Sequence, residues 1–364
     1  MRTSFASCIA GLATIANALP QMPMDMDMKP APPPKITTID PLFRSAANPK
    51  STRVELKYGP YKMPGSNDKT LMKMPGMEDE AGVVDVMLMN GKATKPCSDC
   101  TLKYVKADLT YVDGAKANLK DGAWLHHYTT SVVGPGRSDL ACGSKWKDGE
   151  RLFVVHNDRN ESYFGLNGQD NYGYYLSNED KMSTVLELKN DATDTKEVFL
   201  LVTYEYTPGK PANYKAVKPL WMDAQNCDAP SSEIEPPKNK KVFTVESKQW
   251  TSPIEGTLLT TVGHLHDGAT HLEVMLNNKT VCDSKAVYGG NPEYVPTAKT
   301  LQLGAPKMEH ITKYSPCADF GKIKKGDQIS LKGYYDFEKN SPGLGTSGMP
   351  TGVMGIAMMY LGVD

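Results

Sequence analysis

The chain has 364 residues, with 41 lysines and arginines against 42 aspartates and glutamates, for a formal net charge of -1. This near-neutral balance and a hydrophobic content of 40% exclude a basic nucleic-acid binder and a wholly disordered chain. No apolar run approaches the roughly 20 residues that span a bilayer, so we expect no membrane span, and the length suits two domains.

The first 18 residues have the pattern of a secretory signal peptide. Arg2 precedes an apolar stretch, Phe5–Ala18, which ends in a small-x-small cleavage signal. This pattern favours a cleaved signal over a frayed amphipathic terminus. N-glycosylation sequons at Asn160 and Asn278 agree with the secretory route. We therefore expect a secreted, extracellular protein.

Residues 19–80 are rich in proline and methionine, as a segment that buries no core would be, and we expect them to be largely extended. Their thioethers are soft ligands that suit Cu(I), although methionines placed by chance in a polar leader are an equal alternative. The alternating set is Met22, Met24, Met26 and Met28, and a second cluster is Met72, Met74 and Met77.

The remaining sequence is typical of β-strands. Short runs of β-branched, aromatic or alternating residues are bounded by Gly, Pro, Asn and Asp, and no long amphipathic helix is indicated. These runs are Leu102–Tyr111, Val185–Leu188, Val198–Tyr206, Thr257–Val262, Leu272–Leu276, Ile329–Tyr335 and Val353–Leu361. We expect an all-β protein with two jelly-roll-like β-sandwich domains, 81–225 and 243–364, joined by a polar, proline-bearing linker at 226–242.

The cysteine count is typical of an oxidising compartment. One cysteine, Cys8, would leave with the signal peptide, and the even number that remains predicts three disulfides. The remaining six are Cys97, Cys100, Cys142, Cys227, Cys282 and Cys317. Cys282 and Cys317 are the expected pair in the C-terminal half. The CxxC pair lacks a second CxxC and a βαβ pattern, so we expect it to be structural, with the connectivity of the first domain left open.

Three of the seven histidines lie within eight residues, at His264, His266 and His271. On a strand, residues two apart project from one face, so His264 and His266 can present two imidazoles to one metal ion. Asp267-Gly268 is a hairpin signal, and a hairpin there would place His271 opposite His264 on the same face. The alternative is a polar strand end that binds no metal.

A second group is the adjacent pair His126 and His127, which follows Trp124 and Leu125. Neighbouring residues on a regular strand point to opposite faces, so both reach one metal only if the backbone kinks or one ring uses its Nδ1 atom. The pair alone fits a structural role as well as ligation. The isolated His156 and His310 are expected to be surface histidines or hydrogen-bonded ones.

Together these motifs resemble the copper type II, ascorbate-dependent monooxygenases, the family of peptidylglycine alpha-hydroxylating monooxygenase, over residues 95–364. That family has two jelly-roll-like domains, each carrying one copper across a solvent-filled cleft. Its His-His pair corresponds to His126 and His127, and its His-x-His pair to His264 and His266. Its methionine ligand corresponds to Met354. The resemblance thus implies copper held by His264, His266 and Met354, with His126 and His127 as possible additional ligands; His271 is a further possible ligand from the hairpin geometry alone.

The sequence also departs from that family. In that family a later strand brings a third histidine to the His-His pair. The corresponding strand here, Val185–Lys189, contains no histidine, so the site of His126 and His127 is incomplete unless His156 or a residue outside the motifs completes it. Val262 stands where the family has a substrate-binding arginine, so a peptide carboxylate would find no bidentate partner. Amidation of glycine-extended peptides is therefore not expected.

Three hypotheses remain. The incomplete first-domain site favours a secreted copper-binding protein in extracellular copper handling or redox chemistry. The alternative is a copper-dependent monooxygenase or oxidase that acts on an unidentified substrate with a small-molecule reductant. A third is a structural secreted glycoprotein with a vestigial site. Because His271 rests on hairpin geometry and Met354 on the resemblance, the third ligand of the His264 and His266 site stays open.

Overall fold

The computed structural model describes residues 32–43, 51–68, 81–166, 171–228, 232–289, 293, 309–344 and 349–363. The expected signal peptide and both methionine clusters lie outside these residues and stay predictions. From Pro33 onward the chain forms one unit. Among the described residues, no helix has the length and hydrophobicity of a membrane span.

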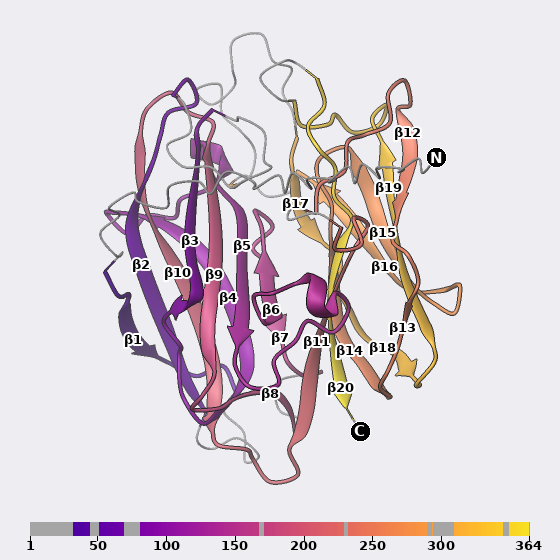
Figure 1. The fold of residues 1–364 in the computed structure, drawn as a ribbon. Helices are drawn as coiled ribbons and strands as arrows, with labels where there is room; N and C mark the ends of the chain where they lie inside the picture. Colours follow the sequence, from indigo (N-terminus) through magenta and orange to yellow (C-terminus); the bar gives the residue numbers. More distant parts are fainter. Residues whose placement is uncertain are drawn as a thin grey trace, which may run out of the picture. The chain divides into compact units, whose positions relative to one another are not determined.

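Three β-sheets make up the described part of the chain (Figure 1). The largest has the order β1 (Lys35–Ile39), β2 (Thr52–Met63), β10 (Lys196–Pro208), β4 (Cys100–Tyr111), β8 (Tyr172–Leu176), β11 (Lys215–Asp223), β20 (Ile356–Val363), β14 (Gly256–His264) and β18 (Cys317–Ile323), with β7 (Ser162–Tyr163) beside β4. The second has the order β3 (Val83–Ala93), β9 (Lys181–Asn190), β5 (Ala123–Val133) and β6 (Glu150–Val155). The third has the order β12 (Val242–Glu246), β19 (Gln328–Asp336), β15 (Ala269–Leu276), β16 (Lys279–Tyr288) and β17 (Ile311–Tyr314), with β13 (Trp250–Thr251) beside β19.

The all-β prediction is confirmed. The helical structure of the described residues consists of short 3₁₀ turns, such as η1 (Leu119–Asp121) and η2 (Gly143–Lys145). Every predicted run lies in a strand, except that Val353–Gly355 precedes β20, where Val353 makes an isolated bridge with Ile234 of the expected linker.

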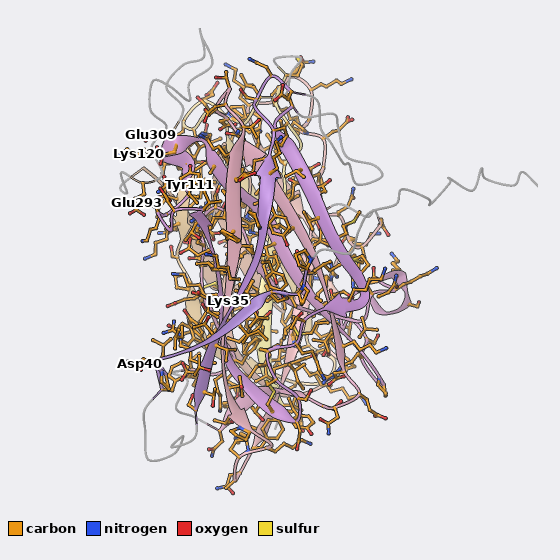
Figure 2. The ribbon with its side chains drawn as sticks, turned by 90° about the vertical axis from the view of Figure 1, so that its left-hand side faces the viewer. Lys35, Asp40, Tyr111, Lys120, Glu293 and Glu309 are labelled. Carbon is orange, nitrogen blue, oxygen red and sulfur yellow. A yellow bond between two sulfur atoms is a disulfide. The ribbon has the colours of Figure 1, made fainter. Side chains whose placement is uncertain are left out.

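The expected extended segment 19–80 also contributes to the sheet. It holds β1 and β2, which pair with each other, and β2 in turn pairs with β10. In β2 the buried residues alternate with more exposed ones, as in Val54, Leu56 and Tyr58. Figure 2 shows the side chains on these strands, with Lys35 at the start of β1 and Asp40 just past its end.

The first hydrophobic core lies between the second sheet and the half of the largest sheet from β1 to β8; we call this half of the molecule the first sandwich. Its core joins residues of β5 and β9, such as Leu125 and Leu188, with residues of β2, β4 and β10, such as Leu56 and Val202. These side chains are almost fully buried, and burying one aliphatic side chain contributes about 1.5–3 kcal/mol.

The second core lies between the third sheet and the strands β11, β20, β14 and β18, which together form the second sandwich. Successive side chains of β20 point to opposite faces of the sheet. Ala357, Met359 and Leu361 therefore belong to the second core, whereas Met358 and Tyr360 pack against the first. Both faces of β20 are thus buried, which explains why its sequence is apolar throughout rather than alternating.

The two sandwiches are joined through the sheet and by side chains. β11 pairs with β20 on one side and runs parallel to β8 on the other, so the largest sheet is continuous from one sandwich to the other. Tyr360 donates a hydrogen bond to the carbonyl of Leu152 in β6 at 2.9 Å. A disulfide between Cys142 and Cys227 links the β5–β6 connection to the segment after β11.

All three predicted disulfides form. Cys282 pairs with Cys317 as expected, and the structural role of the CxxC pair is met by a bond between Cys97 and Cys100. Of the two sequon asparagines, Asn278 is exposed in the turn between β15 and β16, and Asn160 is half-buried with its amide donating to Asp158. Glycosylation at either position stays a prediction.

The expected hairpin at Asp267-Gly268 is wrong. The turn itself is present, because Ala269 donates to the carbonyl of His266 and Gly268 has a φ of 95°. However, β14 pairs with β18 and β20 in the largest sheet, whereas β15 pairs with β16 and β19 in the third. The chain therefore crosses from one sheet to the other at this turn instead of folding back on itself.

Candidate metal centre

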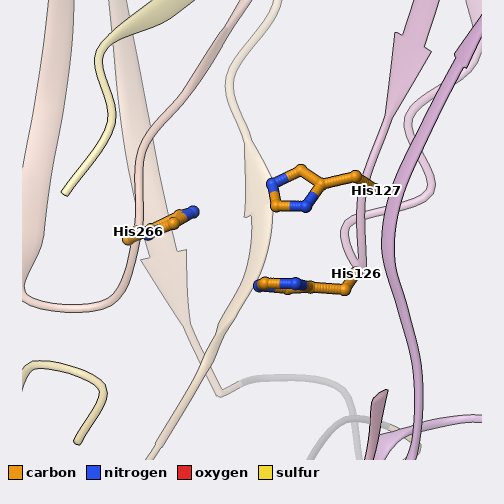
Figure 3. A group of neighbouring side chains, drawn as sticks. All are labelled: His126, His127 and His266. Atoms are coloured by element: carbon orange, nitrogen blue, oxygen red, sulfur yellow. The ribbon is translucent and has the colours of Figure 1, made fainter. Parts of the chain in front are cut away.

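Five of the seven histidines meet where the two sandwiches adjoin. His126 and His127 come from β5, and Figure 3 shows their rings extending toward His266, which follows β14. His156, directly after β6, and His264, the last residue of β14, complete the group. We call these five residues the histidine cluster.

The rings of the cluster are close enough to share a metal ion. The ring centroids of His126 and His127 are 4.2 Å apart, and both lie within 6 Å of His266, at 5.8 and 5.9 Å. The rings of His156 and His264 stack in parallel with centroids 3.2 Å apart, and His127 lies 4.8 Å from His156. Histidines of both sandwiches therefore form one cluster rather than the two separate sites that the family resemblance implies.

A kink in β5 brings the adjacent pair to one side. The pairing of β5 with β9 shifts register between Leu125 and His127, which leaves His126 without an opposite partner. Such a bulge re-aims the side chain next to it. Two neighbouring histidines on a strand need such a backbone kink to reach one ion.

In the second sandwich, the end of β14 directs two histidines to one side without a bulge beside them. His264 and His266 flank Leu265, which is buried in the second core, so the two histidines project away from that core. The main chain is held by two buried tyrosine hydroxyls. Leu265 donates to Tyr314 and His266 donates to Tyr335, each at 3.0 Å.

Glu187 of β9 orients the pair from the first sandwich. One of its carboxylate oxygens, Oε1, contacts Nδ1 of His126 and lies 3.2 Å from Nδ1 of His127. Burial alone would raise the pKa of this carboxyl, but the two histidines beside it hold the pKa well below its usual range. A carboxylate on Nδ1 fixes the ring and leaves Nε2 free for a metal, an arrangement common around metal-ligating histidines.

His266 is oriented by the main chain instead. Its Nδ1 lies 2.6 Å from the carbonyl oxygen of Gly352. Because a carbonyl only accepts, this ring carries its hydrogen on Nδ1 and presents Nε2 as an acceptor.

The remaining ring nitrogens pass the test for a metal site. Several are buried without a hydrogen-bond partner among the described residues, which is costly for a polar atom unless a metal ion or a water satisfies it. They are Nε2 of His127, His156 and His266 and both ring nitrogens of His264. Burial is the main cause that holds the pKa of His156 and of His264 well below the usual value, and repulsion from neighbouring histidines lowers both pKa values further. Neutral imidazoles are the form that binds a metal.

Two three-histidine groups can be drawn within the cluster. One ligand atom from each of His126, His127 and His266 lies within 4.8 Å of the others, and the same holds for His127, His156 and His264. A metal–nitrogen bond of about 2.0–2.1 Å places tetrahedral ligand atoms about 3.3 Å apart, so each group must close by up to about 1.5 Å to hold an ion. The parallel rings of His156 and His264 must also turn, because an imidazole nitrogen binds a metal in the plane of its ring. An all-imidazole set suits copper, zinc, iron or nickel.

The two expected third ligands, Met354 and His271, lie in different surroundings. The main-chain N–H of Met354 and that of His266 both donate to the hydroxyl of Tyr335, so Met354 adjoins the cluster, and its sulfur as a ligand stays a prediction. His271 is in neither three-histidine group. Its ring stacks on Tyr334 of β19 with centroids 4.1 Å apart, because β15 belongs to the third sheet.

One residue of the site is not identified by the sequence. Glu187 lies in the strand that corresponds to the one with the family's third histidine, and its alternation with the core residues Leu186 and Leu188 predicts only a carboxylate on the opposite face, away from the first core. The sequence offers His156 both as a surface or hydrogen-bonded histidine and as a residue that could complete the site of His126 and His127, and no neighbouring motif decides between the two. His156 is 5% exposed, and its Nε2 has no hydrogen-bond partner among the described residues.

The other isolated histidine, His310, is hydrogen-bonded, as expected. Its Nδ1 lies 2.6 Å from the carboxylate of Asp267, and its ring meets that of Trp124 edge-on. Trp124 lies edge-on to His126 as well, so it separates His310 from the cluster.

Fold and site together define an all-β protein with a histidine-rich candidate metal centre, and no family model matches the chain. Two named proteins are similar to it in sequence. The probable copper-dependent oxygenase M1 of Phoma sp. is 29% identical over 266 residues, which cover 73% of this chain and 64% of that protein. The probable copper-dependent oxygenase clz3 of Cochliobolus lunatus is 29% identical over 257 residues, which cover 71% of this chain and 78% of that protein. The chain thus spans less than two thirds of the length of the first relative.

Solved structures give a weaker likeness. PNGase F, a glycosylasparaginase from Flavobacterium meningosepticum, is 10% identical with a TM-score of 0.37, over 86% of this chain and 96% of that one. PNGF-II is 10% identical with a TM-score of 0.39, over 85% of this chain and 65% of that one. Likenesses this weak carry no argument about the site.

Proposed function

We propose that this protein is a secreted copper-dependent oxygenase whose copper is held by the histidine cluster. One observation carries the proposal: five histidines from two sandwiches meet with buried, unpartnered ring nitrogens. The two relatives named as probable copper-dependent oxygenases support copper as the metal and oxygenation as the reaction. This favours the second hypothesis of the sequence analysis over a copper-binding protein without activity.

The residues around the cluster have separate roles in this proposal. Bound copper would supply one-electron chemistry with dioxygen, using electrons from a small-molecule reductant. Glu187 fixes the tautomer of His126 and His127, and the carbonyl of Gly352 fixes that of His266. The side chains of His126 and His127 are 20% and 12% exposed, so small molecules reach the centre from their side.

The substrate is not a glycine-extended peptide in this proposal. Val262 stands where the related monooxygenases have an arginine, and it pairs with Met358 of β20. Ile356 and Met358 stand where those monooxygenases have an asparagine and a tyrosine, and they are 2% and 3% exposed and belong to the first core. No cation at these positions can pair with a carboxylate, so a substrate of a different chemical class is expected.

The test combines metal analysis with oxygen consumption. Protein purified without added copper is loaded with one equivalent of copper, dialysed, and assayed for oxygen uptake driven by ascorbate. We expect copper to be retained and uptake to depend on it, and we expect His127→Ala, which removes a ligand from both three-histidine groups, to lose both. Copper retained without oxygen uptake would favour the copper-handling hypothesis instead. A protein that retains no copper would leave only the structural hypothesis.

His271→Ala is the matched control for this experiment. It also removes a single histidine, but one that stacks on Tyr334 outside both groups. Its copper content and oxygen uptake should equal those of the unsubstituted protein.

A further inference from the structure

We infer that the cluster offers one copper ion two alternative positions, a closed inner one and an open outer one, which share His127. The inner position is formed by His127, His156 and His264, and the outer one by His126, His127 and His266. The inference rests on the proposed function and adds where the ion binds and which position a small ligand can reach.

His127 makes the two positions mutually exclusive. Its Nδ1 faces the carboxylate of Glu187 at 3.2 Å, so only Nε2 remains as a ligand. That atom is buried and has no hydrogen-bond partner among the described residues. One nitrogen lone pair binds one metal ion, so a three-histidine set can be complete at only one position at a time.

The inner position is closed. His156 and His264 are 5% and 9% exposed, and their stacked rings lie beneath the edge of His127. A site with every side covered by protein is typical of a metal that is held and not of one that takes up a further ligand.

The outer position is open. The side chain of His126 is 20% exposed, and His266 is also only partly buried. Each of these rings is fixed at its Nδ1 atom, that of His126 by Glu187 and that of His266 by the carbonyl of Gly352. A fourth ligand such as a small anion can therefore approach from solvent without displacing a histidine.

Charge opposes filling both positions with two ions. The positions adjoin through a single imidazole, and the nearest carboxylate to that ring is Glu187, which is almost fully buried and contacts both His126 and His127. Two cations a few ångströms apart repel strongly in a poorly solvated site. A second ion, left with two histidines and that repulsion, should bind on the order of 100-fold more weakly than the first.

The decisive experiment needs no substitution. The whole purified protein is titrated with Cu(I) against a chromophoric chelator, and we expect one tightly bound equivalent. A second equivalent of equal affinity would overturn the inference while leaving the proposed function intact. The absence of any tight copper would remove the proposed function itself.

Variants then separate the two positions, with azide binding to the Cu(II) form as the probe. His156→Ala removes only the inner set, and we expect it to keep copper and its azide absorption band. His126→Ala removes only the outer set, and we expect it to keep copper but lose the azide band. His271→Ala serves as the control that retains both. Azide binding that survives equally in both cluster variants would contradict an open position distinct from a closed one.

Discussion

The two sandwiches contribute histidines to the same cluster but hold them by different means. In the first sandwich, one buried carboxylate, Glu187, contacts Nδ1 of both His126 and His127. In the second, His266 is held by the carbonyl of Gly352, and its backbone by the hydroxyl of Tyr335. One side of the centre is thus oriented by a charge and the other by neutral dipoles.

This difference predicts different consequences of substitution. A carboxylate on a ligand ring raises its basicity and compensates the charge of a metal cation, so its loss should weaken metal affinity. A hydroxyl that positions the main chain contributes to the folded state whether or not a metal is bound, so its loss should lower stability.

The largest effect is expected for His127→Ala. This residue belongs to both three-histidine groups, so its loss leaves each group with two ligands. Tight copper binding should disappear in a chelator competition assay, with a larger loss than for any other single member of the cluster. Copper affinity equal to that of His126→Ala would contradict its shared role.

The second effect is expected for Glu187→Gln. The amide keeps the shape of the side chain but removes the charge, so copper affinity should fall by about 10- to 100-fold. Chelator competition measures the fall. Glu187→Asp is the companion variant, which keeps the charge and should recover part of the affinity; an equal loss in both would point to shape instead of charge.

A smaller and different effect is expected for Tyr335→Phe. Its hydroxyl accepts from the main chain of His266 and Met354 and donates to the carbonyl of Met354, all in a buried setting. Unsatisfied buried groups cost about 1–3 kcal/mol, so the metal-free protein should unfold at a lower denaturant concentration. Copper affinity should change less than in Glu187→Gln. The reverse order would remove the distinction between the two sandwiches.

The smallest effect is expected for Thr244→Ala. Its hydroxyl donates to the carboxylate of Glu246 at 3.2 Å on the exposed face of β12. Surface substitutions of this kind change stability by at most about 0.5 kcal/mol. Both copper affinity and the unfolding midpoint should match the unsubstituted protein, which calibrates the other three measurements.

The sequence predicts most of the strands because their signals are local. The alternation of β-branched and aromatic residues, with turn residues at the ends, marks β4, β10 and β19 correctly. The same local signals mark the turn at Asp267-Gly268, but they do not say which sheet the next strand joins. That choice depends on β20 and β19, whose partners lie some 60 to 100 residues away in the chain.

The site is predicted only as far as its motifs are local. The spacing of His264 and His266 identifies one half, and the adjacent pair identifies the other once β5 is kinked. His156 and Glu187 carry no such pattern, since each reaches the cluster through sheet packing and pairing between distant segments. A lone histidine and a glutamate within an apolar strand look the same in sequence whether they face solvent or a metal.

The double burial of β20 has a consequence for how the molecule folds. Because this strand contributes side chains to both cores, neither sandwich can complete its interior before residues 356–363 are in place. Contacts between such distant parts of a chain form slowly. The two halves should therefore melt as one cooperative transition rather than two, and the histidines of the first half should meet those of the second only at the end of folding.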